Sequence, residues 1–142
     1  MSTTIPDPST PFGQHVAQRL REDLIAWLTT VDARGTPQPN PVWFLWDGAT
    51  FLVYNLSDAK RLAHIQANAR VSLNLNSTAT GGDLVVITGE AHLTSDESPA
   101  DQVPEYVEKY RERIAQSFGT PAEFARRYPV ALRITPTRLR GR

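Results

Sequence analysis

The sequence predicts an α+β protein in which about six short antiparallel strands form a small barrel, with helices between and around them. Three observations support this class. Short apolar segments are separated by turns that contain Gly and Asp, which is typical of consecutive antiparallel strands. Apolar residues at helical spacing occur in only a few segments. The chain has 142 residues, the size of one domain, and shows no internal repeat or linker.

The six strands are expected where apolar residues alternate with polar ones or form short runs between turns. They are residues 24–31, 36–46, 50–55, 70–76, 83–93 and 130–134. A turn at 32–35 and the hairpin signal Asp47-Gly48 connect the first three strands as antiparallel neighbours. Trp27, inside the first strand, is expected in the core.

Three helices are expected where the apolar spacing changes to three and four residues. They are residues 11–23, 57–67 and 101–118. Ser9 or Thr10 is suited to cap the first helix, because Pro11 follows at its first position. Ser57 or Asp58 is expected to cap the second helix in the same way.

The remaining segments are expected to be irregular. Gly119 is expected to end the third helix, and a short turn follows at 121–127. Residues 1–8 are expected to form a disordered lead, and residues 135–142 a basic tail. The single folded domain is therefore expected to span residues 9–142.

Composition excludes several classes of function. The 15 Lys and Arg residues balance the 15 Asp and Glu residues, so the chain lacks the broad positive field of a nucleic-acid-binding protein. With no cysteine, disulfides, thiolate catalysis and cysteine-ligated metals are excluded. The histidines His15, His64 and His92 are too scattered to indicate a metal site. No apolar run is long enough for a membrane span and the N-terminus has no signal region, so a cytoplasmic location is expected.

Three prolines at every second position distinguish the second strand. Pro37, Pro39 and Pro41 lack amide hydrogens that would all point to the same neighbouring strand. The residues that keep their amides for the other neighbour are Gln38, Asn40 and Val42. This strand is therefore expected to pair on one side only. The open side is either a slot in which a flat ligand meets Gln38 and Asn40, or an ordinary edge protected by proline.

A second signal is the position of two cations at the start of the second helix. Lys60 and Arg61 lie within or just past its first turn, where the helix dipole disfavours positive charge. Free amides, the Ser57 hydroxyl and two cations together favour a phosphate site. The alternative is a solvated charge pair partly balanced by Asp58.

Two unbroken apolar runs suggest a second subunit. Residues 42–46 and 84–87 are apolar throughout, whereas a strand in a small monomer usually has one face in water. The helix at 101–118 is expected to cover one such patch. A homodimer is the simplest way to cover another. The alternative is that the barrel core and the helices suffice.

The order and spacing of several short segments resemble a known family. They are Leu28-Thr29-Thr30-Val31, Gly35-Thr36-Pro37, Pro41-Val42-Trp43-Phe44 with Asp47-Gly48, Ala59-Lys60-Arg61, Arg70-Val71-Ser72-Leu73 and Pro136-Thr137-Arg138-Leu139-Arg140-Gly141. The chain is similar to the pyridoxamine phosphate oxidase-like split β-barrels, and more closely to the B group of flavin/deazaflavin oxidoreductases. The resemblance covers about residues 20–141 and implies a six-stranded antiparallel split β-barrel with flanking helices, as in FMN-binding split barrels.

The resemblance also implies a homodimer with two equivalent cofactor sites at the subunit interface. Residues implied to line the flavin-type ring are Asn40, Pro41 and Val42, with Trp43 adjoining it. Residues implied to hold the phosphate are Asn55, Ser57, Lys60 and Arg61. Asn74 and Asn76 are implied to contribute from the following strand, across the dimer. Arg142 stands where relatives often carry an aromatic residue, and the Arg-rich terminal motif of true pyridoxamine phosphate oxidases is not present.

The function expected on this basis is hydride transfer between the reduced deazaflavin coenzyme F420 and a small enone-like or quinone-like molecule. FMN is the alternative cofactor, because both ligands carry phosphate on a ribityl chain. A non-catalytic protein that binds a flavin or haem is a further alternative, with His64 or His92 as an axial ligand. No general acid or base is assigned, and Tyr54 is only a candidate for proton delivery.

Overall fold

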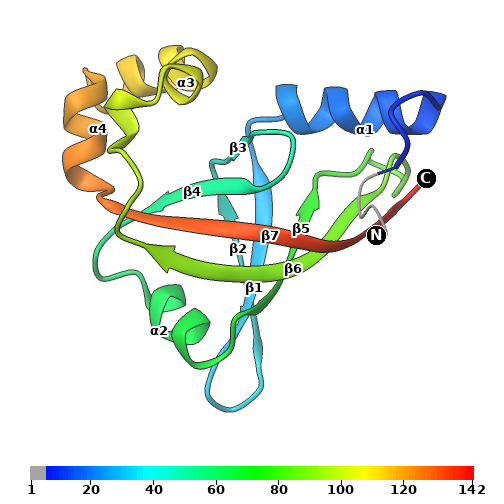
Figure 1. Cartoon of the computed structure of the whole chain (residues 1–142), viewed down its shortest axis with the longest axis horizontal. Helices are drawn as coiled ribbons and strands as arrows, with labels where there is room; N and C mark the ends of the chain where they lie inside the picture. The colour runs from blue at the N-terminus through cyan, green and yellow to red at the C-terminus, as the bar shows by residue number, and fades with distance from the viewer. Residues whose placement is uncertain (1–5) are drawn as a thin grey trace.

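The computed structural model describes residues 6–142, so most of the expected disordered lead lies outside the described residues. The described chain forms a curled antiparallel sheet of seven strands in the order β2-β1-β5-β6-β7-β4-β3. The strands are β1 (Ala26–Val31), β2 (Pro37–Val42), β3 (Leu45–Trp46), β4 (Phe51–Asn55), β5 (Arg70–Leu75), β6 (Val85–Thr94) and β7 (Val130–Gly141). Figure 1 shows β1 and β2 crossing the long strands β6 and β7 at a steep angle, which gives an open barrel.

In the described part of the chain, four α-helices and one short 3₁₀ helix lie around the sheet. They are α1 (Pro11–Glu22), α2 (Lys60–Ala67), the 3₁₀ helix η1 (Ala100–Gln102), α3 (Pro104–Ser117) and α4 (Pro121–Arg127). In Figure 1, α3 and α4 lie together beyond the end of β4, α1 lies across the opposite end, and α2 lies on the other side of the sheet. The segment expected as a turn at 121–127 is therefore a helix, which Thr120 caps by accepting a hydrogen bond from the Glu123 amide.

The expected strand at 36–46 is interrupted, and this raises the strand count from six to seven. Residues Trp43 and Phe44 leave the sheet between β2 and β3. The reason is a set of contacts from α3: the Tyr110 hydroxyl accepts a hydrogen bond from the Phe44 amide at 2.8 Å, and Lys109 Nζ donates to the Phe44 carbonyl at 2.8 Å. The backbone polar groups of Phe44 are thus satisfied by side chains instead of a neighbouring strand.

The expected basic tail at 135–142 is wrong, because these residues continue the last strand. β7 runs to Gly141 and pairs with β6 from Val85↔Gly141 to Thr94↔Ala131. The pairing of β6 with β7 shifts register between Thr88 and Gly89 of β6. The two backbones are so close there that a Cβ atom on Gly89 would lie 2.5 Å from the Thr135 carbonyl oxygen. Residues 135–141 therefore form a strand because they pair with β6, although their polar sequence suggested a tail.

Two clusters of buried side chains form the core. The larger lies inside the curled sheet and is closed by Val16 and Leu20 of α1. The smaller lies between β4, α3 and α4 and contains Tyr106, Tyr110 and Phe124. Trp27 belongs to neither cluster: it is 37% exposed on the outer face of the sheet, so the expected core position is wrong.

The two apolar runs differ in how they are covered. Val42 and Phe44 point into the larger cluster, whereas Trp43 and Leu45 pack on the smaller cluster formed by α3 and α4. The chain's own helices therefore cover both faces of the first run. In the second run, Val85 and Ile87 are buried and the residues that alternate with them are half-buried.

The N-terminal caps of the first two helices differ from each other. Thr10 caps α1 as expected, since its side chain accepts a hydrogen bond from the Gly13 amide at 3.0 Å. Helix α2 begins later than expected: its N-cap is Ala59, and no side chain caps it. The expected cap by Ser57 or Asp58 is therefore wrong, and Lys60 and Arg61 occupy the first two helical positions.

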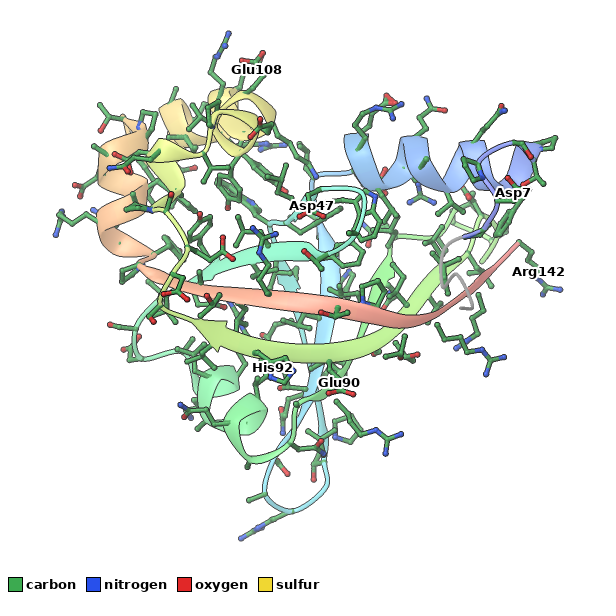
Figure 2. All side chains as sticks on the ribbon, in the orientation of Figure 1. Asp7, Asp47, Glu90, His92, Glu108 and Arg142 are labelled. Atoms are coloured by element: carbon green, nitrogen blue, oxygen red, sulfur yellow. The ribbon has the colours of Figure 1, made fainter. Side chains whose placement is uncertain are left out.

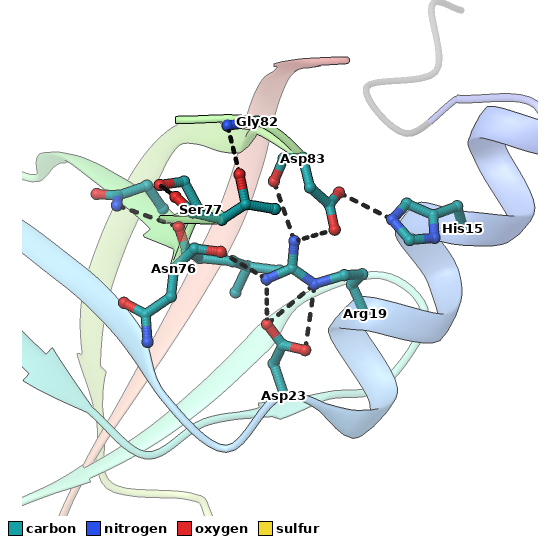
Figure 3. A network of polar contacts seen from close by, with 10 residues as sticks. His15, Arg19, Asp23, Asn76, Ser77, Gly82 and Asp83 are labelled. Carbon is teal, nitrogen blue, oxygen red and sulfur yellow. Dashed lines mark hydrogen bonds and ion pairs between the residues drawn. The ribbon is translucent and has the colours of Figure 1, made fainter. Parts of the chain in front are cut away.

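A network around Arg19 fixes α1 to the loop that precedes β6 (Figure 3). Arg19 forms ion pairs with Asp23, the C-cap residue of α1, and with Asp83 at 3.0 Å. His15 Nε2 lies 2.8 Å from the other oxygen of Asp83, and Arg19 also donates to the Asn76 carbonyl at 2.8 Å. Arg19 thus connects two segments that lie far apart in the sequence.

Candidate functional site

The free edge of β2 forms one side of the candidate site. Within the described chain, β2 is the terminal strand of the sheet and pairs only with β1, in the register Trp27↔Pro41, Thr29↔Pro39 and Val31↔Pro37. The prediction that the proline-bearing strand pairs on one side is confirmed. Because the prolines remove every second amide, the outer edge exposes carbonyl groups and side chains but few donors.

A polar pocket of about 470 Å³ lies beside this edge, between β2 and the start of α2. Its lining residues are Asp32, Gln38, Asn40, Ala59, Lys60, Arg61 and His64. The structure therefore brings together both features singled out in the sequence, the open strand and the pair of cations. The uncapped amides at the start of α2 and the two adjacent cations make this pocket suitable for an anion.

Arg61 is the most unusual residue of the pocket. Its Nε donates to the Asn55 side-chain oxygen at 2.6 Å, and none of the ion pairs between described residues includes Arg61. Burial without a carboxylate partner lowers the pKa of its guanidinium below the usual value. A half-buried cation held by a neutral amide is thus available to an anionic ligand.

Asp32 and His64 complete the polar pocket. The Asp32 carboxylate accepts hydrogen bonds from the Thr36 and Arg34 amides and from Gln38 Nε2 at 3.0 Å. These bonds, that from Thr36 foremost, lower its pKa, so Asp32 is an anion that already has donors. His64 Nδ1 lies 3.0 Å from the buried Thr30 hydroxyl, which leaves Nε2 of the ring for other partners.

A second pocket of about 260 Å³, here called the aromatic pocket, continues from the polar pocket along β2. Its lining residues are Pro41, Val42, Trp43, Tyr54, Arg61, Tyr106, Ser117, Phe118, Phe124 and Tyr128. Arg61 lines both pockets and so marks their junction. The ring of Trp43 stacks on Tyr110 and Phe124 with centroid distances of 4.5 and 5.2 Å. The site therefore has a cationic end and an aromatic end.

The predicted site residues occupy different places relative to these pockets. Gln38, Asn40, Lys60 and Arg61 line the polar pocket, and Pro41, Val42 and Trp43 line the aromatic pocket. Asn55 is completely buried and contacts Arg61, while Ser57 is exposed in the turn before α2.

Asn74 and Asn76 lie elsewhere within this chain. They line a hollow of about 600 Å³ on the outer face of the sheet, together with Trp27 and Arg140. Trp27 Nε1 donates to the Asn76 side-chain oxygen at 2.9 Å. The structure of one chain therefore does not bring these asparagines to the two pockets.

Two other candidates have environments that bear on their chemistry. Tyr54 donates its hydroxyl to the Ser98 carbonyl at 2.6 Å, and burial raises its pKa to about 12. That hydroxyl is therefore a weak acid that already has a partner. His92 lies on β6 near Glu90 (Figure 2). Its side chain is 62% exposed and lines neither pocket. Among residues 6–142, no cluster of three or more His, Asp or Glu side chains suited to a metal ion is found.

Sequence reasoning did not identify the walls of the aromatic pocket. Tyr106, Phe118, Phe124 and Tyr128 come from α3, α4 and the residues that follow each helix, more than 60 positions after β2. The only available signal was the density of aromatic residues between 106 and 128. Asp32 was likewise missed, and His64 was considered only as an axial ligand of haem.

The solved structures that share this fold include an F420 reductase, a heme storage protein and a FAD-binding protein. An F420 reductase is 23% identical and superposes with a TM-score of 0.67 over 87% of this chain and 94% of that chain. The heme storage protein HutZ from Vibrio cholerae is 16% identical, with a TM-score of 0.66 over 93% and 95% of the two chains. A FAD-binding protein from Mesorhizobium loti is 16% identical, with a TM-score of 0.64 over 89% and 88%.

These likenesses concern the fold, because the identities are low. No curated protein matches the chain. No helix in the described part of the chain is long and apolar enough to span a membrane. The sequence profile of the pyridoxamine 5'-phosphate oxidase family, in contrast, matches residues 12–142. That match includes both pockets and every strand of the curled sheet, and the chain therefore belongs to the pyridoxamine 5'-phosphate oxidase family.

Proposed function

We propose that the protein is an oxidoreductase that uses coenzyme F420 to transfer a hydride between the reduced deazaflavin and a small enone-like or quinone-like molecule. The observation that carries the proposal is Arg61, a half-buried cation without a carboxylate partner at the junction of a polar and an aromatic pocket. The phosphorylated tail of such a cofactor would bind at the cationic end, and its flat ring would lie along the open edge of β2 beside the aromatic end. The F420 reductase of the same fold adds support.

The residues present fit such a cofactor. Lys60, Arg61 and the uncapped amides of α2 would hold the phosphate through charge-assisted hydrogen bonds. Gln38 and Asn40 on the open edge of β2 would contact the ribityl chain, and the ring would follow Pro41 toward the aromatic pocket. Asn55 would act through Arg61, since its own amide group is directed to protein atoms.

In this mechanism the protein binds, orients and shields the reactants. The bound cofactor supplies the hydride, which is chemistry that no side chain of this chain provides. The two cations position the phosphorylated tail, and the aromatic walls exclude water from the face of the ring. Tyr54 is a poor proton donor because its hydroxyl bonds to Ser98 and its pKa is raised to about 12.

The partner proposed for the site is a second copy of this chain. Trp27, Asn74 and Asn76 lie at the outer face of the sheet, which the helices of this chain leave open. In a homodimer that face would be covered, and the asparagines would reach the cofactor of the other subunit. Mass measurement in solution tests this: about 31.6 kDa is expected, twice the chain mass of 15.8 kDa, and a monomer at micromolar concentration would contradict it.

Two alternatives share the same pockets. FMN carries the same phosphorylated ribityl chain, so the anion site does not distinguish it from F420. A haem-binding role is favoured by one observation, the free Nε2 of His64 in the polar pocket, and by the fold shared with HutZ.

Titration of the purified protein with F420, FMN and haem separates these functions. We expect F420 to bind most tightly, and its reduced form to be oxidised by members of an enone and quinone panel. Preferential FMN binding would contradict the choice of cofactor. Haem binding that is lost in His64→Ala, without flavin binding, would establish the binding-protein alternative instead.

A further inference from the structure

Tyr106 carries a buried hydroxyl that has no hydrogen-bond partner among residues 6–142. The side chain is 0% exposed and lines the aromatic pocket. Among the described residues, its Oη is the only buried side-chain polar atom without a hydrogen-bond partner. A buried hydroxyl left unpaired is unfavourable, and native structures keep few such groups. Because Tyr106 is one of the residues that line the aromatic pocket, a ligand bound in that pocket is the candidate for the missing partner.

The neighbouring tyrosines show that an unpaired hydroxyl is not forced by the fold. Tyr54 donates to the Ser98 carbonyl at 2.6 Å, and Tyr110 donates to the Leu24 carbonyl at 2.8 Å. The rings of Tyr54 and Tyr110 both contact the ring of Tyr106, with centroid distances of 5.1 and 5.0 Å. Of these three tyrosine hydroxyls, only that of Tyr106 has no backbone carbonyl to accept its hydrogen bond.

The pocket walls favour a planar occupant. Phe124 stacks on Trp43 at an interplanar angle of 15° and on Tyr128 at 14°, so three aromatic planes are nearly parallel. The rings of Phe118 and Trp43 pack edge to face, with an interplanar angle of 88°. These stacked faces cover one another, and what the pocket offers an occupant is a mostly aromatic lining, which favours flat conjugated molecules over branched aliphatic ones. A volume of about 260 Å³ limits the occupant to a small molecule.

We propose that the aromatic pocket binds the small-molecule substrate, a planar conjugated carbonyl compound whose oxygen accepts a hydrogen bond from the Tyr106 hydroxyl. This assignment of the substrate subsite rests on the proposed function. A cofactor whose phosphate is held by Lys60 and Arg61 would have its ring near Pro41, and a molecule in the aromatic pocket would lie beside that ring because Pro41 lines this pocket.

The hydrogen bond has a role in the reaction. Hydride addition to the β-carbon of an enone breaks the carbon–carbon π bond and places the electron pair on the carbonyl oxygen. The Tyr106 hydroxyl stabilises that oxyanion by donation, and a proton from water on the α-carbon completes the reduction. Burial raises the pKa of Tyr106 well above 10, so the group stays protonated and remains a donor.

A pair of matched probes tests the inference. 1-Indanone and indane have the same two fused rings, and only indanone carries a carbonyl oxygen. Their affinities are measured by ligand-observed NMR titration on the wild-type protein and on Tyr106→Phe. We expect the substitution to weaken indanone binding about fivefold to tenfold and to leave indane binding unchanged. Tyr54→Phe, which alters a paired hydroxyl in the same pocket, is expected to leave the indanone-to-indane ratio unchanged.

Other outcomes would overturn the assignment. Equal weakening of both probes would show that Tyr106 only shapes the pocket, and unchanged indanone binding would show that its hydroxyl is not the donor. Titration of Tyr106→Phe with F420 and FMN separates this result from the proposed function. If neither cofactor binds even the wild-type protein, the proposed function fails while the indanone result still stands. If Tyr106→Phe weakens the cofactor instead of indanone, the pocket holds the cofactor ring and the substrate assignment is wrong.

Discussion

The Asn55 side chain fixes Arg61 with a hydrogen bond of 2.6 Å between Arg61 Nε and Asn55 Oδ1. The same amide group donates through Nδ2 to the carbonyls of Val53 and Val130, at 3.1 and 2.9 Å. Asn55 therefore connects β4, β7 and the start of α2 through one buried group. Because this partner is neutral, the Arg61 charge is not cancelled and stays available to a ligand.

The substitution Asn55→Ala tests this arrangement. It leaves two carbonyls without this donor and frees Arg61, so the free energy of unfolding should fall by about 1–3 kcal/mol. Affinity for FMN or F420 should fall by about tenfold, since Arg61 loses its position. Urea denaturation and cofactor titration measure the two effects. A destabilised protein with undiminished cofactor affinity would show that Asn55 does not position the anion site.

Lys60 is expected to bind the phosphate directly. It is exposed at the first position of α2, so Lys60→Ala should change stability little and weaken cofactor binding by about 1.5–3 kcal/mol. Arg113→Ala is the matched control, because it removes a cation from the exposed side of α3, far along the chain from the pocket. Equal losses in the two variants would indicate a general charge effect, and no loss in Lys60→Ala would remove this residue from the site.

Tyr106 and Tyr110 form a natural matched pair for stability measurements. Both are completely buried, but the Tyr110 hydroxyl contacts the Phe44 amide and the Leu24 carbonyl, whereas the Tyr106 hydroxyl has no partner among the described residues. Tyr110→Phe should therefore lower the free energy of unfolding by about 1–3 kcal/mol, and Tyr106→Phe should leave it unchanged or slightly raise it. Thermal and urea unfolding of the protein without ligand compare them. Similar losses in both variants would mean that Tyr106 has a structural partner.

The lowered pKa of Lys109 makes the stability of the protein depend on pH in a specific way. Burial against Phe44 lowers its pKa from 10.5 to about 8, so between these values the unfolded chain binds more protons than the folded one. The stability contributed at this site should rise by about 1–2 kcal/mol from pH 8 to pH 10, and fall again as pH is lowered. The measurement is the difference in unfolding free energy between the wild type and Lys109→Met at both pH values. The exposed Lys60→Met serves as control, and an equal difference at both pH values would contradict the prediction.

Local sequence rules predicted the features that depend on neighbouring residues. The spacing of Pro37, Pro39 and Pro41 identified the edge strand because a missing amide is a property of the residue itself. The cations at Lys60 and Arg61 were recognised as unfavourable at a helix start, although the helix begins two or three residues later than expected. The helix signals around Pro11 and Gly119 were likewise local, and both were confirmed.

The features that were missed depend on contacts between distant segments. The break at Phe44 is caused by Lys109 and Tyr110, which follow it by 65 and 66 positions. The extension of β7 depends on its register with β6. The aromatic pocket depends on α3 and α4 packing against Trp43, and nothing in the local sequence near Trp43 specifies that partner.

The most direct test of the central claim is a crystal structure of the protein with F420 bound. We expect the phosphate to lie within hydrogen-bond distance of Lys60 and Arg61, and the deazaflavin ring to lie along the unpaired edge of β2. A phosphate bound away from the start of α2, or a ring that does not contact β2, would contradict that claim.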